Sequence, residues 1–122
     1  MDEKKFLNQF GETFINDVRK QTILEMNKVL AGDYKAEAIQ KLYAKLNHFS
    51  KEDIEIIKEI SVTAIDNALF NTMFMFESSE DFIIGAVNDD EIINLNDVSD
   101  GLGGEYYKWI DEYCVRFWNI YS

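Results

Sequence analysis

The chain has 122 residues and carries 23 Asp and Glu against 12 Lys and Arg, so its net charge is −11. Its length and 47% apolar content are typical of one globular domain over 1–122. No apolar run approaches the ~20 residues that cross a bilayer, and a single cysteine cannot form an internal disulfide. The composition therefore indicates a cytoplasmic protein without a membrane association. Nucleic-acid binding is also disfavoured, because affinity for phosphates comes largely from Lys and Arg.

The acidity is a regional property. Residues 1–50 hold eight Lys and Arg against seven Asp and Glu, whereas residues 51–122 hold four against sixteen. Within 77–112, Lys108 is the one cation among eleven carboxylates. Repulsion among so many carboxylates lowers stability unless they spread over solvated surface or meet a cationic partner. The charge pattern thus predicts a basic partner for the second half of the chain.

Apolar spacing predicts two helices in the first fifty residues. One extends from Glu3 to about Ala31, with a kink at Gly11 and a left-handed stop at Gly32, and the second fits Tyr34–Asn47. The apolar residues of the first helix that return at every fourth position are Phe6, Phe10, Phe14 and Val18.

A third helix is predicted from Lys51 to about Phe76. Ser50 can cap its start, and Asp53 three residues later resembles a capping box. Polar residues are few between Ile60 and Phe76, so this helix is expected to be the central and most buried one.

Some polar groups in the helices have two interpretations. Asp66, Asn67 and Asn71 interrupt the third helix and form either a solvated strip or buried hydrogen bonds to the following hairpin. His48 and Cys114 lack a motif that would place a catalytic partner beside them, so both are expected to be structural.

The sequence changes character after residue 80. Two short β-branched runs, 82–87 and 91–96, are joined by Asn88-Asp89-Asp90 and predict a hairpin. A glycine-containing loop over 99–104 precedes a last helix from Glu105 to about Ile120. The predicted fold class is α+β and mainly helical, with about four helices and one small hairpin before the C-terminal helix.

The last helix is rich in aromatic residues on more than one face. Tyr107 and Trp118 share one face with Asp111, and aromatic side chains outside a core stripe are typical of protein interfaces. The stripe expected to be buried repeats at every fourth residue: Trp109, Tyr113, Phe117 and Tyr121.

The loop Asn94–Glu105 contains the motifs closest to a ligand site, and they match poorly. No Lys-Ser/Thr follows the glycines, as a phosphate-binding loop requires. In the register of a calcium-binding EF-hand, Val98 and Tyr107 stand where oxygen ligands are needed. We therefore predict no catalytic residue, no metal and no cofactor. An irregular divalent-ion site in this loop, in a small metal-dependent hydrolase or ligand-binding protein, is the alternative.

Two segments resemble a group of bacterial proteins. They are Ile65–Asn71 with Phe76-Glu77, and Ile93-Asn94 followed by Val98–Tyr106 and Trp109-Ile110. The chain resembles, over about its last sixty residues, small acidic bacterial proteins that include immunity-type proteins associated with polymorphic toxins. This resemblance implies a bacterial cytoplasmic protein with a basic cognate target, and it carries no catalytic residues.

The leading functional prediction is a non-catalytic protein-binding module. Its most concrete form is an immunity or inhibitor protein that neutralises a basic toxin through an acidic, aromatic surface. A second alternative is an oligomerising structural domain that self-associates through the last helix. The residues predicted to bind the partner are Asp89, Asp90, Glu91, Asp97, Asp100, Tyr107, Asp111 and Trp118.

Overall fold

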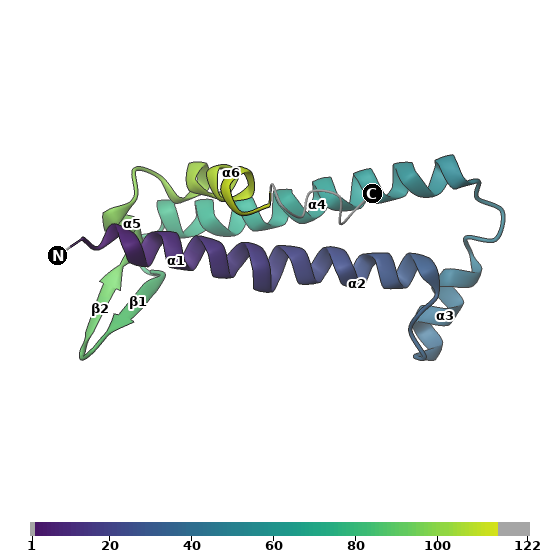
Figure 1. Ribbon diagram of the computed structural model, residues 1–122, viewed down its shortest axis with the longest axis horizontal. Coiled ribbons are helices and arrows are strands. Elements are labelled where there is room, and N and C mark those ends of the chain that lie inside the picture. The colour runs from purple at the N-terminus through teal and green to yellow at the C-terminus, as the bar shows by residue number, and fades with distance from the viewer. Residues whose placement is uncertain (1, 115–122) are drawn as a thin grey trace.

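A computed structural model describes residues 2–114, and its architecture is the predicted one: mainly helical, with one antiparallel hairpin before the last helix (Figure 1). In chain order the elements are α1 (Lys4–Phe14), the π-helical turn η1 (Ile15–Arg19), α2 (Lys20–Ala31), α3 (Glu37–Ala44), α4 (Lys51–Ser78), β1 (Gly85–Asn88), β2 (Glu91–Asn94), α5 (Leu95–Val98) and α6 (Leu102–Tyr113).

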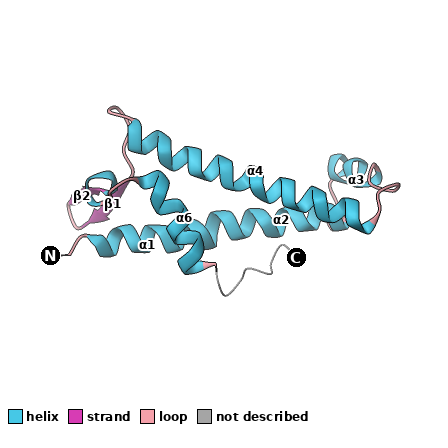
Figure 2. Ribbon diagram, turned by 90° about the horizontal axis from the view of Figure 1, so that it is seen from above, coloured by secondary structure: helices cyan, strands magenta, loops and turns pink. Residues whose placement is uncertain are grey.

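Two long rods form the frame of the molecule. The first is α1, η1 and α2 in continuous succession, and the second is α4, which runs antiparallel beside it. Seen from above, the rods lie together near α3 and diverge toward the hairpin (Figure 2). Helix α6 occupies the wider part and crosses the first rod, so it contacts α1, η1 and α4.

The predicted helix ends are largely confirmed. Gly32 ends α2 in the left-handed conformation with a φ of 73°. Ser50 and Asp53 form a reciprocal capping box, in which each side chain accepts the other's backbone N–H. The helix predicted over Tyr34–Asn47 is shorter in the structure, because only Glu37–Ala44 is helical.

The most buried row of the first rod is displaced by one residue from the row in the sequence pattern. Of the patterned row, Phe6, Phe10 and Phe14 are partly buried against the core and Val18 is exposed, whereas Arg19 is buried.

The predicted kink at Gly11 is absent, since Gly11 lies within α1. The helix is instead irregular at the π-turn η1, where the Lys20 N–H donates to the carbonyl of Ile15, five residues earlier. The rotation per residue is smaller in a π-turn than in an α-helix. Residues four apart in the sequence therefore remain on the side of the rod that faces the neighbouring helices. This buried row is Leu7, Gly11, Ile15, Arg19 and Ile23.

Helix α4 is not the most buried helix, contrary to the prediction. Of its 28 residues only Val62 and Met73 are buried. Its outer side is left uncovered because α2 and α6 both pack on one side of it.

The hairpin and α6 are shifted relative to their predicted limits. The strands are four residues each, with Val87 opposite Ile92 and Asn88 opposite Glu91. Helix α6 begins at Leu102 rather than Glu105 and ends at Tyr113, so two of the loop glycines are helical. The predicted continuation to Ile120, with Phe117 and Tyr121, lies outside the described residues.

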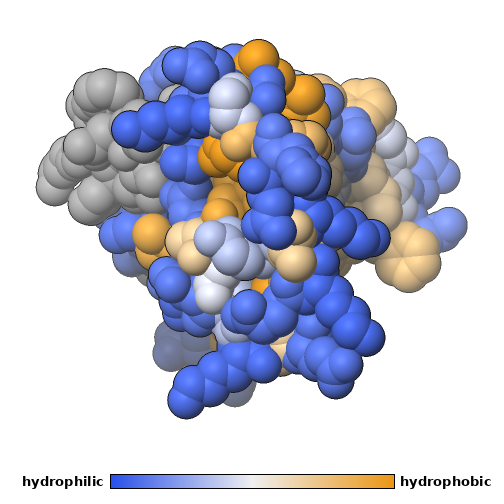
Figure 3. All heavy atoms as spheres, turned by 90° about the vertical axis from the view of Figure 1, so that its right-hand side faces the viewer, coloured by the Kyte–Doolittle hydropathy of each residue, from blue (hydrophilic) through white to orange (hydrophobic). Residues whose placement is uncertain are grey.

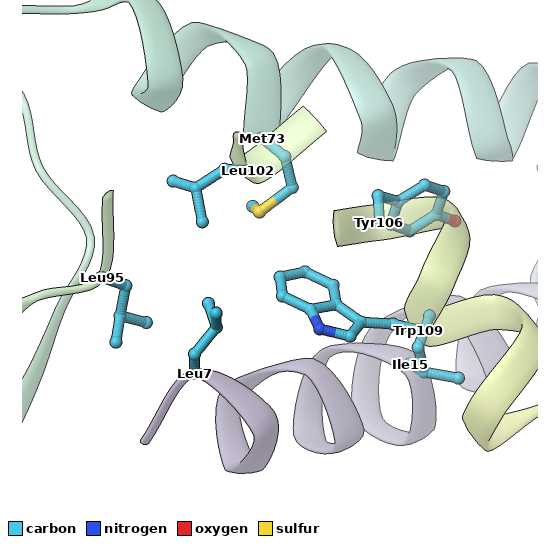
Figure 4. Close-up of a cluster of buried hydrophobic side chains, with 7 residues drawn as sticks. All are labelled: Leu7, Ile15, Met73, Leu95, Leu102, Tyr106 and Trp109. Carbon is cyan, nitrogen blue, oxygen red and sulfur yellow. The ribbon is translucent and has the colours of Figure 1, made fainter. Parts of the chain in front are cut away.

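The core sits where α6 enters the space between the rods (Figure 4). The indole of Trp109 fills it, and Gly11 makes room for the ring: a Cβ at Gly11 would lie 2.4 Å from the indole Nε1. That Nε1–H is buried and has no hydrogen-bond partner within residues 2–114. The buried apolar side chains of this core are Leu7, Ile15, Met73, Leu95, Leu102, Tyr106 and Trp109.

Substituting Gly11 by Ala should therefore destabilise the protein, although Ala is normally the better helix former. We expect a loss of about 1–3 kcal/mol, the usual range for overpacking a core. The matched control is Gly104→Ala in α6, where a Cβ meets nothing within 4 Å. Urea denaturation should show the control unchanged or slightly more stable, and a stable Gly11→Ala variant would contradict this packing.

Candidate functional site

The carboxylates predicted to bind a partner gather at one end of the molecule. Asp89, Asp90 and Glu91 are exposed at the turn of the hairpin, which projects from the helical body (Figure 1). Asp97 in α5 and Asp100 just after it are also exposed, and α5 lies beside the base of the hairpin. Five of the eight predicted site residues therefore lie on neighbouring elements.

Apolar side chains accompany these carboxylates. Val87 and Ile92 face each other across the two strands and are 76% and 67% exposed. Phe82 and Ile83, just before β1, are exposed as well. Large apolar groups on a projecting element mark interaction sites more often than isolated surface residues do. We call residues 87–92 the hairpin tip.

A groove lies between α1 and the hairpin. It has a volume of about 290 Å³, large enough for one or two side chains of a binding partner. Its lining is largely apolar and continues into the hairpin tip through Val87. The lining residues are Phe6, Gln9, Phe10, Thr13, Gly85, Ala86, Val87 and Leu95.

The other predicted residues lie elsewhere. Tyr107 and Asp111 are both exposed on α6, four residues apart. Tyr107 packs on Phe70 of α4, with ring centroids 5.4 Å apart, and Phe70 stacks on Phe74 at 6.1 Å. Trp118 lies outside the described residues. The predicted surface is thus divided between the hairpin end and the seam of α4 with α6.

A buried polar network lies beneath this seam. Arg19 of η1 is only 6% exposed, and its guanidinium binds both carboxylate oxygens of Asp66 in α4, at 2.6 and 3.1 Å. The Tyr106 hydroxyl donates to the same carboxylate at 2.7 Å, and Arg19 also donates to the Cys114 sulfur at 3.3 Å. Side chains from η1, α4 and α6, together with Cys114 just after α6, are therefore held together.

This environment stabilises the ion pair and suppresses reactivity. Burial disfavours the charged guanidinium, but the hydrogen bond to Asp66 and its charge outweigh burial, so the pKa of Arg19 is raised. Burial, reinforced by the hydrogen bond to Asp66, raises the pKa of Tyr106. Burial also raises the pKa of Cys114, which opposes formation of a nucleophilic thiolate.

The sequence prediction missed most of this network. Asp66 binds Arg19 and Tyr106 and not the hairpin, while Asn67 and Asn71 are exposed. One signal was available: Arg19 stands four residues from both Ile15 and Ile23, in line with the buried row. Since a buried arginine requires a carboxylate, Asp66 in the apolar helix was its natural partner.

In the loop Asn94–Glu105, the alternative divalent-ion site, the side-chain oxygens of Asn94, Ser99 and Glu105 form hydrogen bonds within the loop, whereas Asp97 and Asp100 are exposed. The Ser99 hydroxyl accepts the N–H of Gly101 at 2.9 Å and donates to Glu105 at 3.4 Å. The carboxylate of Glu77 in α4 accepts the N–H of Gly103 at 2.8 Å, which holds the first turn of α6. Within residues 2–114, no group of three or more His, Cys, Asp or Glu is placed to hold a metal ion.

Comparison with protein-family models, curated proteins and solved structures finds no match to this chain. Within the described range, no helix combines the length and apolar content needed to span a bilayer.

Replacing Asp66 by Ala should strongly destabilise the protein, because the buried Arg19 guanidinium would lose the carboxylate that it binds through both oxygens. The expected loss is about 3–5 kcal/mol in the free energy of unfolding. Glu59→Ala is the control, since it removes the same charge from an exposed position on the same helix and should change stability by less than about 0.5 kcal/mol. Equal urea midpoints for the two variants would argue against a structural role for the buried pair.

Proposed function

We propose that this protein is a non-catalytic protein-binding module whose hairpin end docks on a basic partner. Its most concrete form is an immunity-type inhibitor that covers the cationic face of a toxin in the bacterial cytoplasm. The observation that carries the proposal is the hairpin tip, where three exposed carboxylates adjoin an exposed apolar pair on an element that projects from the body.

The carboxylates would act mainly on recognition and association rate. Asp89, Asp90 and Glu91 are exposed, so each is solvated and contributes little to fold stability. Placed together on a protein of net charge −11, they create a negative field that attracts a cationic surface and repels phosphates. Charge complementarity of this kind speeds encounter and selects the partner.

The apolar groups would supply much of the affinity. Val87 and Ile92 are mostly accessible, and burying a Val or Ile side chain contributes about 1.5–3 kcal/mol. The adjacent groove between α1 and the hairpin could accept a side chain of the partner. Binding would then inhibit by covering the partner's cationic substrate site, with no bond made or broken.

The Cys114 thiol is free and half-buried, which is compatible with a reducing cytoplasm.

The charge prediction is tested with the triple variant Asp89→Asn, Asp90→Asn, Glu91→Gln. The probe is the purified product of the gene directly upstream, the position in which a cognate toxin would be encoded. By biolayer interferometry at about 50 mM salt, the triple variant should associate about tenfold more slowly than the unmodified chain. Raising the salt to about 300 mM should weaken binding of the unmodified chain and reduce this difference.

The matched control is Glu25→Gln, Asp33→Asn, Glu52→Gln. These three carboxylates are exposed on or near the helices away from the hairpin, and both triple variants change the net charge from −11 to −8. The control should associate within about twofold of the unmodified chain. Absence of binding, or equal slowing by both triple variants, would refute docking through the hairpin tip.

The apolar prediction uses Val87→Thr with Ile92→Thr. Threonine keeps the β-branched shape that suits a strand, so the free energy of unfolding should stay within about 0.5 kcal/mol. The Kd for the same probe should rise at least about tenfold, mainly through faster dissociation. Leu42→Thr, at an exposed position on α3, is the control and should leave the Kd unchanged. Unchanged dissociation of the double variant would exclude these two side chains from the interface.

A further inference from the structure

Strand β1 has a free outer edge. The Leu95 N–H donates to the carbonyl of Ile84 at 2.9 Å, just beyond the last pair of the ladder. Because hydrogen-bonded and non-bonded pairs alternate along an antiparallel ladder, Gly85 and Val87 direct their backbone N–H and C=O groups away from β2. Both residues are exposed, and no backbone hydrogen bond outside the ladder involves either of them within residues 2–114. Strand β1 therefore offers backbone donors and acceptors to a further strand.

The groove between α1 and the hairpin follows this edge. Its lining residues on the hairpin strands are Gly85, Ala86 and Val87, three in succession and all from β1. The side chains of a strand alternate between its two faces, so three successive residues on one wall place the edge of the strand toward the groove. Figure 1 shows β1 on the side of the hairpin along which α1 extends. The free backbone groups of β1 thus border the groove.

Helix α1 forms the facing wall, with the rings of Phe6 and Phe10 beside the polar Gln9 and Thr13. A strand added to β1 would point every second side chain toward this wall. Two such side chains lie about 7 Å apart, which is also the length of strand from one free β1 residue to the next. The groove volume of about 290 Å³ suits two apolar side chains of moderate size.

Charge at the hairpin turn determines the chemistry of the added segment. Strand β1 leads directly into the exposed Asp89 and Asp90. The side chains of an added strand that point away from α1 would lie near these carboxylates, so Lys or Arg is favoured there. On the helix wall, the Lys5 ammonium lies 5.1 Å from the centre of the Phe6 ring. The cationic residues of the segment therefore belong at the turn and its apolar residues at the helix wall.

The pocket at the α3 end of the molecule is of a different kind. It has a similar volume of about 270 Å³, but Leu30, Tyr43 and Ile54 in its lining come from helices. Helical N–H and C=O groups bond along their own helix, so they offer no edge to a strand. Lys41 and Lys45 are exposed near this pocket, and hydrophilic side chains dominate the space-filling view of this end (Figure 3). Strand edge and acidic turn occur together at the hairpin.

We propose that the outer edge of β1 binds an extended segment of the basic partner, which adds a third strand to the hairpin. The backbone of the segment pairs with Gly85 and Val87, its apolar side chains occupy the groove against α1, and its Lys or Arg side chains face Asp89 and Asp90. This binding mode rests on the proposed function, because the segment belongs to the same partner.

The first test uses a synthetic peptide of four Lys-Val repeats, blocked at both ends, with the full chain at about 50 mM salt. We expect a submillimolar Kd and, at saturation, an about fivefold slower exchange of the Gly85 and Val87 amides with water, measured by NMR. The Ile92 and Asn94 amides point outward from β2 by the same alternation and are the internal control, with unchanged exchange.

A peptide with four Lys followed by four Val has the same charge and composition but cannot place its apolar residues on one side. It should bind at least about tenfold more weakly. Equal binding of the two peptides, no binding of either, or equal slowing on both edges of the hairpin would overturn strand addition.

The second test removes the outward N–H. Proline is tolerated in an edge strand where the N–H faces outward, so Val87→Pro keeps the ladder to β2. It should bind the Lys-Val peptide at least about tenfold more weakly than Val87→Thr, which keeps the N–H. The matched pair on β2, Ile92→Pro and Ile92→Thr, should differ by less than about threefold. An unchanged NMR signal of the buried Trp109 indole checks that each variant is folded. Equal binding by Val87→Pro and Val87→Thr would contradict the proposal.

The proposed function and this binding mode fail in different ways. If the product of the upstream gene requires the hairpin carboxylates but binds Val87→Pro and Val87→Thr equally, docking through the tip stands and strand addition is excluded. If that product binds no form of the chain, the proposed function is refuted whatever the peptides show.

Discussion

The bidentate ion pair between Arg19 and Asp66 is the interaction on which the arrangement of the long helices depends. It joins the middle of the first rod to the middle of α4, and Tyr106 adds α6 to the same carboxylate. The net attraction within a buried ion pair adds little to the free energy of folding, because both charges have lost their water. Any packing that separated the two charges would, however, be strongly unfavourable. The pair therefore holds the first rod, α4 and α6 together at one buried point.

The π-turn and Gly11 are both compatible with that position. Arg19, the last residue of the turn at Ile15–Arg19, lies on the buried side of the rod. One turn earlier, Gly11 leaves space for Trp109, so α6 can enter the widening gap between the rods. The π-turn and the glycine at position 11 in the first rod are thus both matched to the docking of α6 on that rod.

The molecule has two surfaces that differ in charge, and the ion pair between Arg19 and Asp66 accounts for one of them. Asp66 is the single charge in the second half of α4 before Glu77, and its inward orientation leaves the outer face of the helix neutral. The carboxylates of the acidic segment instead project at the hairpin and α5, beyond the core. The molecule therefore has a neutral surface along the outer side of α4 and an acidic surface at the hairpin end.

The sequence by itself determined the long helices, the hairpin, the capping box at Ser50, the stop at Gly32 and the acidity of the hairpin turn, because these depend on neighbours a few residues apart. It did not predict the π-turn at Ile15–Arg19 or the short helix α5, which replaces the predicted end of the second strand. It could not determine which face of each helix is buried. In the first rod, the row that starts at Phe6 and the adjacent row that starts at Leu7 both carry apolar residues at every fourth position or nearly so, and the structure buries the second more deeply. Nor could it show that Asp66 turns inward while Asn67 turns outward. Only the tertiary structure decided that, since the partner of Asp66 stands 47 residues away in the chain and a buried charge is placed by its partner.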